Sequence, residues 1–263
     1  MVTLIVPVYN KVHLTERCLQ SALENSRTLK SVIVVDNGST DTTSEVLARF
    51  KSKFEECGFF FTVIRNGQNK GFGSACNQGI RLAQTDYVAI LNNDTWLMPE
   101  WDRALIEALK QKDFDMVGPF FDERPWPDDI QERVKTYLSR NPPKTRFHFV
   151  PILMFFTKDA IAKLELPGGG IFDERFFVTY EDTDLLYRMK KLNLTYAQTS
   201  RCYIWHQSMG TRAEKGALPV NYEADGLKRF IEKWGFDPRR NEHSLIERLK
   251  RRYRKYQSAR GMF

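Results

Sequence analysis

Three acidic residues stand close together in Glu181-Asp182-Thr183-Asp184, at what the sequence pattern predicts to be the first turn of a helix. A helix dipole stabilises each carboxylate at that end by about 0.3 to 1 kcal/mol, which keeps it ionised. An ionised carboxylate can serve as the general base that takes a proton from an attacking hydroxyl. Helix capping alone accounts for one of these acids, but not for three beside a group of aromatic residues.

Polar residues also follow two short apolar runs. Asp36 ends the run 31–36, where a carboxylate can accept a hydrogen bond from a nucleobase N–H or a ribose hydroxyl. Asn92-Asn93-Asp94 follows the run 87–91, so a second carboxylate stands just after a predicted strand. Both segments also have the composition of ordinary Asx turns, which is the structural alternative.

The elements that must position these residues alternate along the first half of the chain. Apolar runs predict strands, and amphipathic stretches between them predict helices. The predicted strands are 4–8, 31–36, 59–64, 87–91 and 115–119, and the predicted helices are about 12–25, 41–50 and 74–83, with another opened by Pro99. This alternation predicts an α/β fold with a doubly wound, mostly parallel sheet, which binds ligands at the carboxyl ends of its strands.

The second half is less regular. We expect a helix over 127–140, an apolar strand over 147–157, a helix from Glu181, two short strands at 194–198 and 202–205, and a helix ending in Lys233-Trp234-Gly235-Phe236 that serves packing, with Gly235 as its C-cap. The predicted organisation is one domain over 1–238, made of a regular half at 1–120 and a less regular half at 121–238. A basic helical tail follows at 239–263.

The charge is concentrated in that tail. Residues 239–263 hold nine Lys and Arg against two acids, which equals the whole net charge of +7. The predicted tail is an amphipathic helix, and three roles stay open for it: binding an anionic membrane surface, binding nucleic acid, or forming a solvated or oligomer-forming helix.

Composition and cysteine usage narrow the class of protein. In 263 residues, 42% are hydrophobic and 28% charged, which is typical of a globular domain and excludes disorder. No apolar run approaches the roughly 20 residues of a membrane helix. Four scattered cysteines fit reduced thiols. We therefore expect a cytoplasmic protein, with a peripheral place at the inner face of the membrane as an option.

Five motifs in order give the chain a resemblance to the family-2 glycosyltransferases. They are Leu4-Ile5-Val6-Pro7-Val8-Tyr9-Asn10, Val34-Val35-Asp36-Asn37-Gly38-Ser39, Asn69-Lys70-Gly71-Phe72-Gly73 with Asn77, Leu91-Asn92-Asn93-Asp94, and Glu181-Asp182-Thr183-Asp184-Leu185 with His206. Each motif is weak alone, but together they cover residues 2 to 235 in the family's layout. The resemblance implies the GT-A fold, an inverting mechanism, a nucleotide-sugar donor and a divalent metal, Mg²⁺ or Mn²⁺. It also implies that the half at 1–120 binds the nucleotide sugar and that the half at 121–238 binds the acceptor.

The resemblance also implies roles for individual residues. Asp182 is the base, and Glu181 orients the acceptor. Asp94 and His206 hold the metal. The residues near the donor nucleotide are Pro7, Val8, Tyr9, Asp36, Asn69, Lys70, Gly71, Asn77 and Asn93. The chain departs from the acid-rich form of the metal motif, because only Asp94 is charged in Asn92-Asn93-Asp94. The diphosphate of the donor must then supply other ligands.

The expected function is transfer of a sugar from a UDP- or dTDP-type donor to a hydroxyl of a glycan or a lipid-linked acceptor. The first alternative keeps this chemistry but places the acceptor on a hydroxymethylpyrimidine in DNA, as the basic tail suggests. A second alternative is a non-catalytic sugar-nucleotide-binding protein. A sugar-nucleotide pyrophosphorylase is disfavoured, because the sequence lacks an early glycine-rich loop with paired Arg and Lys.

Overall fold

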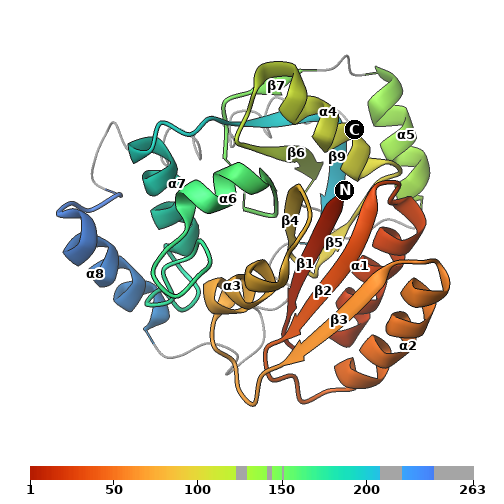
Figure 1. Cartoon of the computed structure of the whole chain (residues 1–263), viewed down its shortest axis with the longest axis horizontal. Coiled ribbons are helices and arrows are strands. Elements are labelled where there is room, and N and C mark those ends of the chain that lie inside the picture. Colours follow the sequence, from red (N-terminus) through yellow and green to blue (C-terminus); the bar gives the residue numbers. More distant parts are fainter. Residues whose placement is uncertain (123–128, 141–143, 150, 208–220, 240–263) are drawn as a thin grey trace.

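A computed structural model describes residues 1–122, 129–140, 144–149, 151–207 and 221–239 (Figure 1). A single mixed sheet forms its centre, with the strand order β3-β2-β1-β4-β8-β6-β9-β5 and with β7 paired to β9. The strands are β1 (Val2–Val8), β2 (Leu29–Asp36), β3 (Phe60–Arg65), β4 (Tyr87–Leu91), β5 (Thr95–Trp96), β6 (Met116–Asp122), β7 (Thr145–Arg146), β8 (Leu153–Thr157) and β9 (Tyr196–His206).

The parallel part of the sheet lies where the sequence predicts it. Strands β3, β2, β1 and β4 run parallel to one another, and β6 runs parallel to β9. Strand β8 runs antiparallel to both β4 and β6, and β5 and β7 run antiparallel to β9. The fold is therefore α/β with a mostly parallel sheet, as expected. The tail predicted at 239–263 lies outside the described residues except for Arg239, so its helix and its partners stay predictions.

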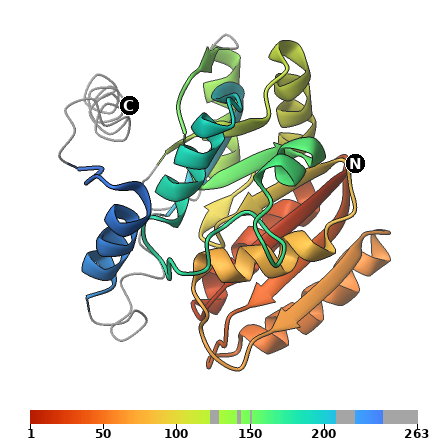
Figure 2. The ribbon, with the colours of Figure 1, turned by 60° about the vertical axis from the view of Figure 1, so that its left-hand side comes forward.

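Helices cover both faces of the sheet. The side chains of α1, α2, α4 and α5 share one buried apolar cluster, and those of α3, α6 and α7 share the other. Helix α8 lies beyond α7, away from the sheet (Figures 1 and 2). The helices are α1 (Val12–Asn25), α2 (Thr43–Glu56), α3 (Phe72–Leu82), α4 (Trp101–Lys112), α5 (Ile130–Arg140), α6 (Lys158–Leu164), α7 (Glu181–Lys191) and α8 (Tyr222–Trp234).

Close packing of α3 on the sheet depends on a missing side chain. A Cβ added at Gly79 would lie 2.5 Å from the Ile5 side chain of β1, so only glycine lets the helix come this near. This approach places the first turn of α3 beside the carboxyl ends of β1 and β2, where the sequence predicts the nucleotide.

Several predicted elements differ from the structure. The apolar run 147–157 forms a strand only over β8, because Pro151 lies in its first half and removes a ladder donor. The two strands predicted at 194–198 and 202–205 are one continuous strand, β9, with a register shift against β6. Helix α2 extends six residues past the predicted end at Phe50, and β5 and α6 were not predicted at all.

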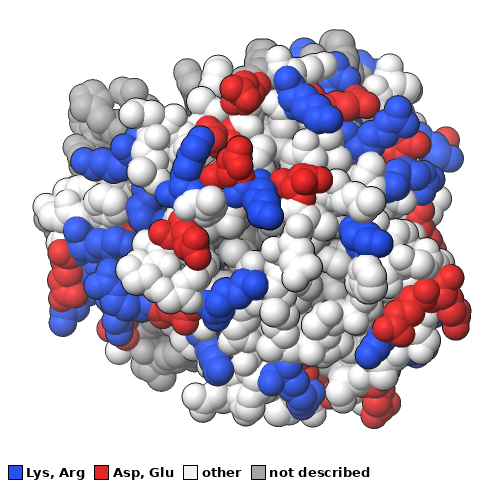
Figure 3. Space-filling model, viewed as in Figure 1, with Lys and Arg blue, Asp and Glu red and all other residues white. Residues whose placement is uncertain are grey.

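The charge distribution, the cysteines and the helix lengths can be compared with what the composition predicts. Lys and Arg are interspersed with Asp and Glu on the face shown in Figure 3. All four cysteines are free, and burial raises the pKa of Cys18, Cys76 and Cys202. Within the described part of the chain, no helix combines the length and apolarity needed to cross a bilayer.

Candidate active site

The first predicted site residue, Asp36, closes β2 with a carboxylate that is only 1% exposed. One carboxylate oxygen accepts the N–H of Ser39 at 2.8 Å, and the other accepts a guanidinium N–H of Arg65 at 2.6 Å. Arg65 ends β3 directly opposite Asp36 in the sheet register, and its side chain is 53% exposed. The sequence pattern does not single out Arg65, because only the register of β2 and β3 places it beside Asp36.

The turn after β1 is tied to the turn after β2. Pro7 and Val8 are buried at the end of β1, and Tyr9 follows them with its side chain partly exposed. Asn10 then adopts a left-handed conformation, donates its N–H to the Ser39 hydroxyl, and accepts the N–H of Thr40. Tyr9 therefore emerges beside the segment that follows Asp36, as the sequence predicts for a nucleoside pocket.

Asn69, Lys70 and Gly71 gather around Asn37, the neighbour of Asp36. The Asn37 amide donates to the Asn69 side chain at 2.8 Å and to the Gly71 carbonyl at 3.1 Å, and it accepts the Lys70 N–H at 3.0 Å. The Lys70 side chain is exposed, so its ammonium is available to an anion. Gly71 has a φ of +88°, and a Cβ there would lie 2.2 Å from the carbonyl oxygen of Phe177.

Asn77 lies apart from this group, in the middle of α3. Its amide group donates to the Phe172 carbonyl and the Glu174 carboxylate, and its oxygen accepts the N–H groups of Ile171 and Phe172. These four hydrogen bonds use the full capacity of an amide side chain. The geometry assigns Asn77 to anchoring the segment 171–174, and its contact with a donor stays a prediction.

The two predicted metal ligands meet at the far end of the same edge. The pairing of β5 with β9 places Thr95 opposite His206, and the His206 Nε2 lies 3.1 Å from the Asp94 Oδ1. Asn93, buried next to them, donates its amide to the Thr15 hydroxyl at 3.0 Å. The sequence predicted both ligands but not β5, the short strand that brings them together.

Asp94 and His206 fit a divalent cation as part of a ligand set. Their facing atoms, the His206 Nε2 and the Asp94 Oδ1 at 3.1 Å, are an imidazole nitrogen and a carboxylate oxygen, which are donor types that Mg²⁺ or Mn²⁺ would accept. The Thr95 hydroxyl, next in sequence to Asp94, is fully buried and has no hydrogen-bond partner among the described residues. One more oxygen is therefore free to bind a polar group beside the pair. No cluster of three or more acidic, His or Cys side chains that could hold a metal ion occurs among the described residues.

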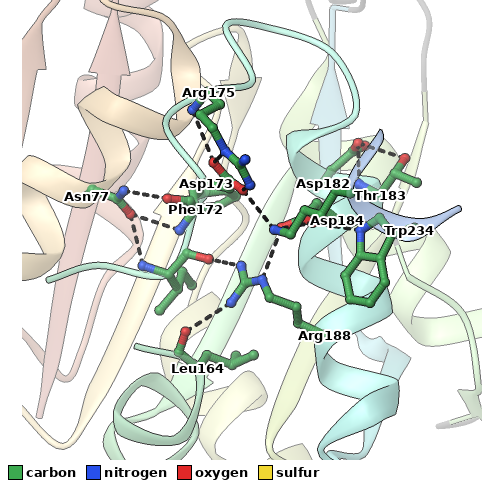
Figure 4. Close-up of polar contacts among 12 residues, drawn as sticks. Asn77, Leu164, Phe172, Asp173, Arg175, Asp182, Thr183, Asp184, Arg188 and Trp234 are labelled. Atoms are coloured by element: carbon green, nitrogen blue, oxygen red, sulfur yellow. Dashed lines mark hydrogen bonds and ion pairs between the residues drawn. The ribbon is translucent and has the colours of Figure 1, made fainter. Parts of the chain in front are cut away.

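The predicted base, Asp182, lies in the first turn of α7. Its Oδ1 accepts the N–H and the hydroxyl of Thr183, whereas its Oδ2 has no hydrogen-bond partner among the described residues (Figure 4). Glu181 is buried beside it, and a Cβ at Gly73 would lie 3.8 Å from the Glu181 Cβ. The start of α7 therefore lies close to the start of α3.

A match to a protein-family model shows the family to which the chain belongs. The model of glycosyl transferase family 2 matches residues 3–167, which is more than half of the chain. The chain belongs to glycosyltransferase family 2. The match includes Asp36, Asn93 and Asp94, whereas Asp182 and His206 lie beyond it. The roles predicted for these two residues therefore do not rest on the family match.

Curated relatives resemble parts of this glycosyltransferase chain. Chondroitin synthase of Escherichia coli is 33% identical over 100 residues, which is 38% of this chain and 14% of that protein. Poly-beta-1,6-N-acetyl-D-glucosamine synthase of Staphylococcus aureus is 31% identical over 109 residues, which is 41% of this chain and 25% of that protein. The chain thus corresponds to a minor part of each of these longer proteins.

Solved structures share the GT-A fold of this glycosyltransferase. GalNAc-T7 with UDP, GalNAc and Mn²⁺ has a TM-score of 0.67 at 13% identity, covering 89% of this chain and 49% of that one. The mannosyltransferase PcManGT from Pyrobaculum calidifontis, with GDP-Man and Mn²⁺, has a TM-score of 0.59 at 19% identity, covering 88% and 64%. At these identities the likeness establishes the fold.

Proposed function

We propose that this chain is an inverting glycosyltransferase that moves a sugar from a UDP- or dTDP-type donor to a hydroxyl of a glycan or a lipid-linked acceptor. The observation that carries the proposal is the placement of three groups along one edge of the sheet. Asp36 lies at one end of that edge and the Asp94–His206 pair at the other. The first turn of α7, which holds Glu181 and Asp182, approaches the start of α3, where a Cβ at Gly73 would lie 3.8 Å from the Glu181 Cβ.

The pair of Asp36 and Arg65 supports a uracil-type base. Uracil and thymine present an N–H between two carbonyl oxygens, so a carboxylate can accept the N–H while a guanidinium donates to a carbonyl. Cytosine has a hydrogen-bond acceptor in place of that N–H. Its ring nitrogen and the Asp36 carboxylate would then be two acceptors facing one another, which is unfavourable. Tyr9 is exposed enough at this end to lie against the base.

The transfer step requires one proton acceptor. As the acceptor oxygen attacks the anomeric carbon, its bond to that carbon forms while the bond to the diphosphate oxygen breaks, and the Oδ2 of Asp182 takes the hydroxyl proton. The Asp94–His206 pair would hold Mg²⁺ or Mn²⁺, which neutralises the charge on the departing diphosphate when it is bound.

Nucleotide selectivity tests the donor side of this proposal. In calorimetric titrations with UDP, dTDP, CDP and GDP in the presence of Mn²⁺, we expect UDP or dTDP to bind at least about 10-fold more tightly than CDP, because an unsatisfied buried hydrogen-bonding group costs about 1–3 kcal/mol. Arg65→Ala should reduce this selectivity.

The matched control for that variant is Arg49→Ala. Arg49 is 51% exposed and forms an ion pair with Glu16, so it resembles Arg65 in exposure and pairing but lies on α2, away from Asp36. Equal affinity for UDP and CDP in the unmodified protein, or selectivity that Arg65→Ala leaves intact, would contradict the assignment of the base pocket.

A further inference from the structure

The helix that ends in Lys233-Trp234 does more than pack. The Lys233 ammonium lies between two carboxylates, 2.8 Å from Asp173 Oδ2 and 2.6 Å from Asp184 Oδ1, and its side chain is only 19% exposed. The neighbouring Trp234 donates its indole N–H to Asp184 at 2.9 Å (Figure 4). Without the ammonium, two largely buried carboxylates would face one another across the gap that it fills.

Asp184 connects this bridge to the predicted base. It is fully buried in the first turn of α7, two residues after Asp182, and its second oxygen accepts an N–H of Arg188 at 3.0 Å. Arg188 also donates to the carbonyl oxygens of Leu164 and Ile171. The position of the start of α7 therefore depends on the partners of Asp184.

Asp173 connects the bridge to the donor side. Its segment is anchored on α3 through the four hydrogen bonds of Asn77, and α3 starts at the Gly71 turn. Burial alone would raise the pKa of Asp173, but hydrogen bonds from Arg175 and Lys233 outweigh it and hold this pKa well below its usual range. Asp173 is thus held as an anion that Lys233 can bind.

We propose that Lys233 is a positioning residue that sets Asp182 against the donor half, by tying the segment 171–175 to the first turn of α7. The proposal rests on the proposed function, in which Asp182 is the base. It adds to that function a requirement for α8, a helix outside the part of the chain that the family model matches.

Other contacts hold α8 in place, so the loss of Lys233 should not detach it. Phe230 is fully buried and lies against the rings of Tyr180 and Tyr187, at centroid distances of 5.9 Å each. At the other end, Gly226 packs so closely that a Cβ would lie 2.4 Å from the Thr179 hydroxyl. We expect a folded variant with a misplaced base.

The test compares Lys233→Met with Lys228→Met. Lys228 lies on the same helix, is 76% exposed, and pairs only with Glu232 of that helix among the described residues. For Lys233→Met we expect kcat for transfer to fall by about 10- to 100-fold, because a displacement of about 1 Å can cost that much. The Kd for UDP and the KM for the donor should stay within about twofold, and Lys228→Met should match the unmodified protein.

A second readout does not depend on activity. Hydrogen exchange of the backbone over 173–186 should be faster in Lys233→Met, with exchange over β1–β3 unchanged. Asp173→Asn removes only the other end of the bridge and leaves Lys233 on Asp184, so it serves if Lys233→Met fails to fold. It should show the same loss of kcat, and the double variant should be no worse than the more impaired single variant.

The outcomes distinguish the role of Lys233 from the assignment of Asp182 as the base. Asp182→Asn, measured alongside, must lose activity, and full activity in it would overturn both the base assignment and the role of Lys233. Loss of activity in Asp182→Asn with normal kcat in folded Lys233→Met or Asp173→Asn would overturn the role of Lys233 alone. A parallel weakening of UDP binding would also overturn it, because the bridge would then act on the donor site.

Discussion

Asp182→Asn is expected to lower kcat for sugar transfer by about 10²- to 10⁴-fold, the usual contribution of a positioned general base. Asn keeps the shape of the side chain and can still accept the Thr183 hydrogen bonds through its oxygen, but it cannot take a proton. Donor affinity should change little, because Asp36, Arg65 and the Asn37 network remain. The measurement is steady-state kinetics with donor and acceptor varied separately.

The control for Asp182→Asn is Asp225→Asn. Asp225 also lies in the first turn of a helix, α8, and is exposed, so its substitution tests the loss of a helix-start carboxylate as such. We expect that variant to retain normal kcat. Wild-type kcat in a folded Asp182→Asn variant would show that another group accepts the proton.

Asp94→Ala is expected to remove the effect of metal on donor binding. In the unmodified protein, Mn²⁺ should strengthen the binding of a UDP-sugar at least about 10-fold, which corresponds to about 1.4 kcal/mol. Without the Asp94 carboxylate, His206 is left as one neutral ligand, and the affinity with Mn²⁺ should approach that in EDTA. Calorimetry with and without EDTA measures both values.

Asp86→Ala provides the control for the metal experiment. Asp86 is an exposed acid that pairs with the N-terminal amine, so its loss changes the net charge equally without touching the site. His206→Ala should behave like Asp94→Ala. A metal effect that persists unchanged in both site variants would show that the ion is held elsewhere.

The sequence was most informative where local pattern and fold coincide. Strands β1 to β4 are apolar runs bounded by turn residues, so both their existence and the meeting of Tyr9 and Asp36 at one edge could be predicted. Asp94 and His206, which the structure brings within 3.1 Å of one another, could also be named as candidate metal ligands. Both lie at the ends of apolar runs, which is the place where parallel sheets bind ligands.

What could not be predicted depends on contacts between distant segments. Strand β5 has two residues, too few to show a periodicity, and it exists because β9 offers it a pairing edge. Arg65 pairs with Asp36 only through the strand register, and Lys233 meets Asp173 and Asp184 only after α8 docks on α7. In the sequence, Arg65 and Lys233 are each simply a basic residue near the end of a predicted element.

The apolar run 147–157 is a case in which the sequence predicts more strand than the structure contains. Its composition predicts one long strand, but only β8 pairs with β4, and the first part of the run contributes buried side chains such as Phe149 instead. Hydrophobicity reports burial, whereas a strand also needs a partner at every position and tolerates Pro151 poorly.

The most direct test of the central claim is release of nucleoside diphosphate from a panel of UDP-, dTDP-, GDP- and CDP-sugars, with Mg²⁺, with Mn²⁺ and with EDTA, in the presence of glycan and lipid-linked acceptors. We expect one uridine or thymidine donor to be turned over in a metal-dependent reaction that Asp182→Asn abolishes. The absence of turnover from every donor, by a protein that nevertheless binds UDP with Mn²⁺, would contradict a transferase and indicate a sugar-nucleotide-binding protein.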